Sequence, residues 1–476
     1  MSREKKLVKN TFILTLGQFL PKFTVLLTLP IYTAMLTKEE FGTYELINTL
    51  VLMLIPIITF QLPMATFRFL INCRDENSED KKRKIISSSC IFIGITSFIS
   101  LIIVYFFLPN IDFHIKILIC LFLLLDIIVE LTKQIARGLG DIKTFSFSTA
   151  IHAITNVIFV VILLSFMNMG LSGLLISLNI AMACTILFIL IRTKIVKYIN
   201  IRSFDKALLK EFFKYSIPLI PNAVSLHVIN AAGRIITAAY MGLEATAIYA
   251  VANRIPQLLG QVYGVFGLSW HENASETCDA KDSEKYYSNV FNNLFNLLSG
   301  FTAVLIAATP IIFIILVRGD YDEAYFQIPI LYLGVFFHCL MGFFGGIYVA
   351  VKKTLAVGIS SVISAAFSIA VNFIFIEQIG LYAASISMLV GFAGIFVFRL
   401  IHTRKWKKIE YKWTKNILCF IAILIVIAIY YQKSLVFDVI NITLSIIFAC
   451  FINKNIIIAI FKKGTSIIKK HLKKSP

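Results

Sequence analysis

Three polar residues recur on one side of a strongly apolar stretch near the middle of the chain. His227, Asn230 and Arg234 are three and four positions apart, a spacing that places their side chains on one face of a helix. An ionisable residue in an apolar helix is costly, so it marks either a ligand pathway or a paired structural site. A guanidinium group can bind phosphate oxygens bidentately. The stripe therefore predicts contact with an anionic group.

Two further stripes combine cations with amides in the same way. One stripe, Arg254, Gln257 and Gln261, lies in the next apolar stretch. The other, Gln18 and Lys22, lies in the first apolar stretch, where the two residues are one helical turn apart. We expect the three stripes to line one cationic cavity. The predicted residues that bind an anionic head group are Lys22, Arg234 and Arg254. The predicted polar lining is Gln18, His227, Asn230, Gln257 and Gln261. The competing interpretations are hydrogen bonds that hold helices together and cations that extend to the membrane interface.

A fourth stripe carries both signs of charge. Asp126, Glu130, Lys133 and Arg137 follow one another at helical spacing. Two carboxylates one turn apart repel each other at low dielectric, which makes one of them a candidate proton carrier. Asp126 and Glu130 are therefore candidate ion-coupling residues, for H⁺ or Na⁺, and a self-neutralised structural stripe is the alternative. The eight cysteines are scattered without a CxxC pair, so we expect no metal site and no cofactor.

The elements that position these residues must lie in a membrane. Of the 476 residues 58% are hydrophobic and only 15% are charged, whereas soluble domains carry about 25% charge. The expected fold is an all-α integral membrane protein with about 14 transmembrane helices, each near the 20 apolar residues that a bilayer requires. The expected spans are 10–36, 41–68, 86–109, 114–136, 144–166, 171–192, 212–241, 246–270, 286–316, 327–350, 354–376, 380–401, 413–432 and 435–452.

The loops alternate in charge as the positive-inside rule requires. With the N-terminus inside, the inner segments hold 38 of the 45 lysines and arginines, and the net charge of +19 follows mainly from this topology. We therefore expect a multi-pass membrane protein, with both termini cytoplasmic and no nucleic-acid partner. The chain has no P-loop, so an ion gradient or the membrane potential would drive transport.

The prolines suggest an internal duplication. Four of the 11 lie in the first two spans and three in the seventh and eighth. An even repeat length predicts two six-helix bundles related by a pseudo-twofold axis along the membrane normal, with the substrate path between them. The expected domains are 1–200, 201–410, a helical hairpin over 411–452, and a basic amphipathic cytoplasmic tail over 453–476. Chance similarity is the alternative to a duplication.

Two longer motifs resemble a known family. Residues 214–222, Lys-Tyr-Ser-Ile-Pro-Leu-Ile-Pro-Asn, lead through Gly242-Leu243-Glu244 to residues 248–256, Ile-Tyr-Ala-Val-Ala-Asn-Arg-Ile-Pro. This segment is similar to spans 7 and 8 of Wzx-type polysaccharide repeat-unit flippases of the multidrug/oligosaccharidyl-lipid/polysaccharide exporter superfamily. The motifs 40–44, Glu-Phe-Gly-Thr-Tyr, and 137–141, Arg-Gly-Leu-Gly-Asp, fit the same family.

The resemblance implies a flippase, not an enzyme. Its substrate would be undecaprenyl-diphosphate-linked oligosaccharide, moved across the bacterial inner membrane by alternating access for O-antigen, capsule or exopolysaccharide assembly. Lys22, Arg234 and Arg254 would then bind the diphosphate. The bilayer, glycan polymerase and chain-length proteins would be its partners. The family commonly carries an acidic residue before the arginine that matches Arg234, and here that position is Gly233.

Three other functions compete with this one. A cation-coupled multidrug antiporter of the same superfamily would require an acidic cavity for cationic substrates, whereas the predicted stripes are basic. A peptidoglycan lipid-precursor flippase would be indispensable for growth. A glycan polymerase or glycosyltransferase would carry a substantial external loop, and the predicted outer connections are short.

Overall fold

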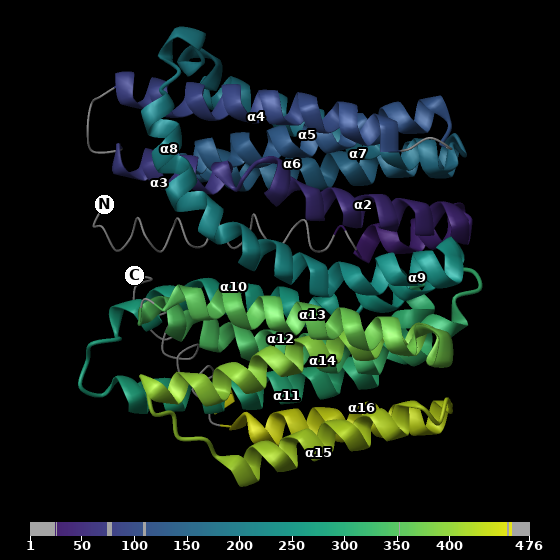
Figure 1. Cartoon of the computed structure of the whole chain (residues 1–476). Helices are drawn as coiled ribbons and strands as arrows, with labels where there is room; N and C mark the ends of the chain where they lie inside the picture. Colours follow the sequence, from purple (N-terminus) through teal and green to yellow (C-terminus); the bar gives the residue numbers. More distant parts are fainter. Residues whose placement is uncertain are drawn as a thin grey trace, which may run out of the picture. The chain divides into compact units, whose positions relative to one another are not determined.

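The computed structural model is built from helices packed side by side (Figure 1). It describes residues 24, 26–73, 79–107, 111–351, 353–454 and 457–458. Within these residues there is no β-strand, and the chain is an all-α integral membrane protein. Lys22 and Gln18, and most of the basic tail predicted over 453–476, lie outside the described part of the chain.

An apolar helix over Leu26–Met35 precedes the labelled elements. The α-helices of the N-terminal half are α2 (Lys38–Ile58), α3 (Leu62–Asn72), α4 (Glu79–Phe107), α5 (Phe113–Gly138), α6 (Ile142–Val160), α7 (Gly170–Thr193), α8 (Lys206–Ser216) and α9 (Ile220–Arg254). The later α-helices are α10 (Gln257–Glu276), α11 (Ser283–Leu316), α12 (Asp322–Ala350), α13 (Thr354–Ile379), α14 (Leu381–His402), α15 (Trp413–Tyr430) and α16 (Leu435–Ile452). The short helical segments are η1 (Val161–Phe166), η2 (Ile195–Tyr198), η3 (Ile201–Ser203), η4 (Ile217–Leu219) and η5 (Thr403–Lys405).

Among the described residues, 11 helices are long and apolar enough to cross a membrane. The other three predicted spans are accounted for individually. Only the second part of 10–36 is described, as the short helix Leu26–Met35. The span 114–136 is α5, which carries the mixed-charge stripe, and the span 246–270 is divided between α9 and α10. Most helices therefore follow the expected spans, but the expected span 41–68 is divided between α2 and α3, and the expected span 212–241 begins within α8 and continues in α9.

The described chain forms two compact units. The first unit combines the residues up to Arg254 with Leu316–Tyr321 and Val357–Met388. The second unit contains Ile255–Ile315, Asp322–Ala356 and the residues from Leu389 on. In the first unit α5 packs against α4, α6 and α7, and α8 lies across α3 and α4 (Figure 1). The predicted division into 1–200 and 201–410 stays a prediction.

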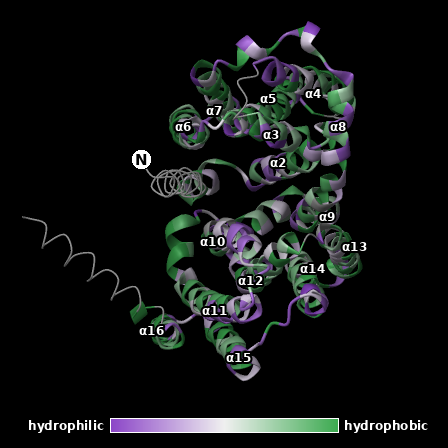
Figure 2. Ribbon diagram, turned by 90° about the vertical axis from the view of Figure 1, so that its left-hand side faces the viewer, coloured by the Kyte–Doolittle hydropathy of each residue, from purple (hydrophilic) through white to green (hydrophobic). Residues whose placement is uncertain are grey.

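The lateral surface of the helices is apolar. Large apolar side chains on these helices are more than half exposed, for example Phe98 and Phe106 on α4 and Ile191 on α7. In a protein surrounded by water, removing such side chains from the solvent would be strongly favoured. Figure 2 shows apolar residues along these helices and hydrophilic residues at the connections between them. An exterior of this kind needs lipid around it, and it agrees with the composition.

Candidate functional site

A buried carboxylate on α2 binds two arginines of α9. The Glu45 side chain is only 3% exposed, and its Oε1 accepts hydrogen bonds from Nη2 of Arg254 and, at 3.2 Å, from Nε of the same residue. Nε of Arg234 lies 3.3 Å from the other carboxylate oxygen, Oε2. Nη1 of Arg234 also donates to Oγ1 of Thr49 at 3.5 Å, one turn along α2. The two predicted phosphate ligands of this unit thus meet on one acidic residue.

A fold-back in α9 allows both arginines to reach Glu45. They are 20 positions apart, which a straight helix would place about 30 Å apart. The chain turns at Gly242, whose φ of 87° and ψ of −178° are non-helical and require glycine. The residues before Gly242 form one limb and those after it another. The first limb corresponds to the seventh predicted span, and the second limb contains the beginning of the eighth predicted span, up to Arg254.

Aromatic rings enclose Arg254. Its guanidinium carbon lies 5.2 Å from the ring centroids of both Tyr32 and Phe41. Tyr44 packs against the same two rings, with centroids 6.0 Å from Tyr32 and 6.4 Å from Phe41. Cation–π attraction and two hydrogen bonds to one carboxylate therefore hold the Arg254 side chain in place. Its side chain is 11% exposed, compared with 18% for Arg234.

Arg234 follows a glycine because a tyrosine occupies the neighbouring space. A Cβ atom at Gly233 would lie 2.6 Å from Oη of Tyr249 on the other limb of α9. An acidic side chain before Arg234 would therefore collide with this ring. Glu45 supplies the negative charge from α2 instead, so the departure from the family pattern does not leave Arg234 without an acidic neighbour.

The start of α2 is fixed by a capping box. Oγ1 of Thr37 accepts the N–H of Glu40 at 3.1 Å, and a Glu40 carboxylate oxygen accepts the N–H of Thr37 at 3.0 Å. The other Glu40 oxygen accepts the N–H of Leu171 at 3.0 Å, which ties α2 to the start of α7. Gly42 allows the closest approach to α9, because a Cβ there would lie 1.9 Å from the Leu243 carbonyl oxygen. The 40–44 motif therefore positions the helix that carries Glu45.

The three ionised side chains leave a formal surplus of one positive charge. Burial of two guanidinium groups is tolerated because each meets Glu45 and further hydrogen-bonding or aromatic partners. The ion-pair geometry of Arg234 is looser, since its Nε is not aligned for a hydrogen bond although it is 3.3 Å from Oε2. An incoming anion could replace Glu45 at Arg234 more easily than at Arg254.

The other predicted cavity residues are placed as follows. Asn230 is half-buried on α9 and donates its amide to the Leu226 carbonyl at 3.0 Å, and His227 lies half-buried two turns before Arg234. Gln257 and Gln261 lie in the first turns of α10, in the second unit. Their cavity-lining role, and the role of Lys22 and Gln18, stay predictions.

The mixed-charge stripe on α5 shows mainly structural contacts. Glu130 accepts a hydrogen bond from Nε2 of Gln134 at 3.1 Å, and the Arg137 guanidinium stacks 4.2 Å from the Phe67 ring centroid. Asp126 is half-buried one turn before Glu130. The ion-coupling role of Asp126 and Glu130 stays a prediction.

Glu45 was not among the residues expected from the sequence. The predicted site residues come from the cationic stripes and from the stripe on α5, whereas the second span contributes only prolines and the 40–44 motif. The sequence does carry one signal for Glu45. It is a lone carboxylate four positions before Thr49, in an apolar stretch that has no other charge beyond its first turn.

The family model described as "Polysaccharide biosynthesis protein" matches residues 7–269. No curated protein matches the chain. A solved multidrug resistance MATE family transporter of the MOP superfamily, in an inward-facing conformation, has a TM-score of 0.70 and 14% identity over 82% of this chain and 97% of its own. The lipid II flippase MurJ, in an inward closed conformation, has a TM-score of 0.69 and 17% identity over 94% of this chain and all of its own. The fold is therefore that of MOP superfamily transporters.

Proposed function

This chain belongs to the polysaccharide biosynthesis protein family, and on that premise we propose that it is a flippase for undecaprenyl-diphosphate-linked oligosaccharide repeat units. The substrate would cross the bacterial inner membrane by alternating access and supply O-antigen, capsule or exopolysaccharide assembly. The observation that carries the proposal is the Glu45 carboxylate held between Arg234 and Arg254 in membrane helices.

The cluster supports binding of an anion in exchange for the Glu45 carboxylate. In the described structure Glu45 takes the place that a phosphate oxygen could take beside each guanidinium group. We assign the first contact with the diphosphate to Arg234, because its side chain is more exposed and its link to Glu45 is looser. Arg254 would hold Glu45 nearby, so that the carboxylate can return to Arg234 when the lipid-linked substrate leaves.

The charge balance argues against a cationic substrate. The one buried carboxylate of the cluster already faces two guanidinium groups, so the cluster repels cations. A multidrug antiporter for cations is therefore the weaker candidate, although the fold is shared. Drug-resistance profiling on overexpression would separate the two functions, since the proposed flippase should confer no resistance.

A matched pair of arginine variants tests the proposal in cells. R234Q should abolish surface glycan in a strain that relies on this protein, while immunoblotting finds the variant in the membrane at the normal level. R318Q is the control, because Arg318 lies in an exposed connection of the same unit and its substitution removes the same charge. Normal surface glycan in the R234Q strain would refute the proposal.

A second measurement separates binding from transport. The purified protein is titrated with a polyprenyl diphosphate, and binding is followed by thermal shift. R234Q should weaken binding, because a phosphate ligand is lost. E45Q should bind at least as tightly as the unmodified protein, since the competing carboxylate is gone, yet fail to support surface glycan. Equal binding by R234Q and R318Q would contradict the assigned role of Arg234.

A further inference from the structure

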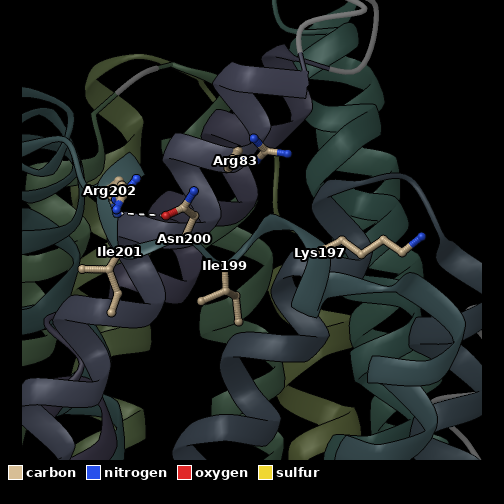
Figure 3. Close-up of a pocket in the computed structure, with 6 residues that line it drawn as sticks. All are labelled: Arg83, Lys197, Ile199, Asn200, Ile201 and Arg202. Carbon is tan, nitrogen blue, oxygen red and sulfur yellow. Dashed lines mark hydrogen bonds between the residues drawn. The ribbon is translucent and has the colours of Figure 1, made fainter.

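A hollow lined by three cations lies where α4 meets the connection from α7 to α8. Its volume is about 610 Å³, and its lining residues are Arg83, Lys197, Ile199, Asn200, Ile201 and Arg202. The close-up in Figure 3 shows Arg83 on α4 and the other five on the connection, with the two isoleucine side chains pointing away from Arg83. All six residues belong to the first unit, and none of them is part of the Glu45 cluster.

Hydrogen bonds to α4 fix the connection in this shape. Oγ of Ser87 donates to the Tyr198 carbonyl at 2.7 Å and accepts the N–H of Asn200 at 3.0 Å. Oγ of Ser88 accepts the N–H of Asp205 at 2.9 Å. Ser87 and Ser88 are fully buried, so these bonds are shielded from solvent. The cations are thus presented by an anchored backbone.

Two acidic residues close in sequence to the hollow form ion pairs with neighbouring lysines. Asp205 accepts the N–H groups of Ala207 and Leu208 at the start of α8 and pairs with Lys84 at 3.4 Å. Glu79 pairs with Lys82 at 3.2 Å. No acidic residue is among the six that line the hollow. Its three cations, Arg83, Lys197 and Arg202, are exposed. The lining of the hollow therefore carries a net positive charge, with Glu79 as an additional electrostatic neighbour of Arg83.

Exposed apolar side chains accompany this charge. Ile201 is 81% exposed and Val196 is 62% exposed, on the segment that follows the membrane-spanning helix α7. A surface that combines cations with exposed aliphatic groups beside the end of such a helix matches the polar–apolar boundary of a lipid leaflet. A solvated loop would gain nothing from exposing two large aliphatic side chains next to three cations.

We propose that this hollow binds the phosphodiester head group of an anionic phospholipid. Arg83, Lys197 and Arg202 contact the phosphate, while Val196 and Ile201 insert beside the acyl chains. The lipid would hold the α7–α8 connection against the leaflet on the side predicted to be cytoplasmic. This inference does not depend on which substrate the protein transports.

Native mass spectrometry of the full chain tests the proposal. The delipidated protein in detergent is titrated with phosphatidylglycerol, with phosphatidylcholine, and with inorganic phosphate in a separate arm. The unmodified protein should retain phosphatidylglycerol in preference to phosphatidylcholine. R83Q/K197Q/R202Q should weaken the tightest phosphatidylglycerol binding on the order of 100-fold, because each cation beside an anionic lipid contributes roughly a factor of five.

Two further variants locate the effect. K405Q/K408Q/K412Q removes three exposed charges from the connection between α14 and α15 and should leave the tightest binding unchanged. R83K/R202K keeps the charge and should retain most of the affinity. Equal losses in both triple variants, or equal retention of the two phospholipids, would overturn the proposal. So would displacement of the lipid by inorganic phosphate at similar concentration, since that would indicate a site for free phosphate.

Discussion

Oε1 of Glu45 accepts two hydrogen bonds from the Arg254 side chain, across 209 positions of sequence. This pair joins α2 to the second limb of α9, and Arg234 from the first limb completes the contact. Three membrane segments are therefore connected through one carboxylate. Because buried ions are stabilised only by their partners, the cluster is expected to be sensitive to the loss of any member.

Removal of the carboxylate should be more harmful than removal of one arginine. E45Q should lower the free energy of unfolding by about 3 kcal/mol, because it leaves two buried guanidinium groups without a carboxylate, whereas R254Q should cost less, because Glu45 keeps Arg234 as a partner. The double variant E45Q/R254Q should be more stable than the sum of the single effects predicts. Denaturant titration in detergent micelles measures the four proteins of this cycle. Additive effects would show that the two side chains are not energetically coupled.

Gly42 should tolerate no larger residue. In G42A the added Cβ would lie 1.9 Å from the Leu243 carbonyl oxygen, and backbone cannot move aside as a flexible side chain can. We expect the free energy of unfolding to fall by about 1–3 kcal/mol or more, since 1–3 kcal/mol is the usual range for overpacking. G94A is the matched control, because no atom lies within 4 Å of a Cβ at Gly94 in α4. G94A should keep or slightly raise the thermal unfolding midpoint, and a comparable loss in both variants would contradict this packing.

The capping box of α2 should contribute measurable stability. T37A removes the oxygen that accepts the Glu40 N–H, and N-cap substitutions of this kind cost about 1 kcal/mol. Thr43 provides the control, since its hydroxyl only donates to the Glu39 carbonyl within the same helix. T43A should change the unfolding free energy much less than T37A. The same effect in both would mean that the cap adds nothing.

Stability should depend on the ionisation of Asp205. The N–H of Leu208, and to a lesser extent Lys84, hold the pKa of the Asp205 carboxyl below its usual value. Because the pKa is lower in the folded protein, the contribution is present above the ordinary pKa of about 4 and is lost as the pH falls below it. D205N keeps the N-cap but cannot titrate. The difference in thermal midpoint between the unmodified protein and D205N should therefore shrink on acidification from about pH 6 to about pH 3, and a constant difference would contradict the assignment.

The sequence alone determined the class of fold and the positions of most helices. Apolar stretches near 20 residues long can satisfy their backbone groups in lipid only as helices, so their number and order follow from local composition. The sequence also marked Arg234 and Arg254 as unusual, because ionisable residues in apolar helices need a local reason.

Only the tertiary structure showed what those arginines contact. Glu45 is 189 positions from Arg234, and helical periodicity relates residues within one helix but not across helices. The fold-back at Gly242 depends on a backbone angle, and the collision that explains Gly233 depends on the ring of Tyr249 from the other limb. The hollow at Arg83 likewise requires α4 and the α7–α8 connection to meet. Local pattern fixes which side chains are costly to bury, whereas packing between distant segments decides which partners compensate them.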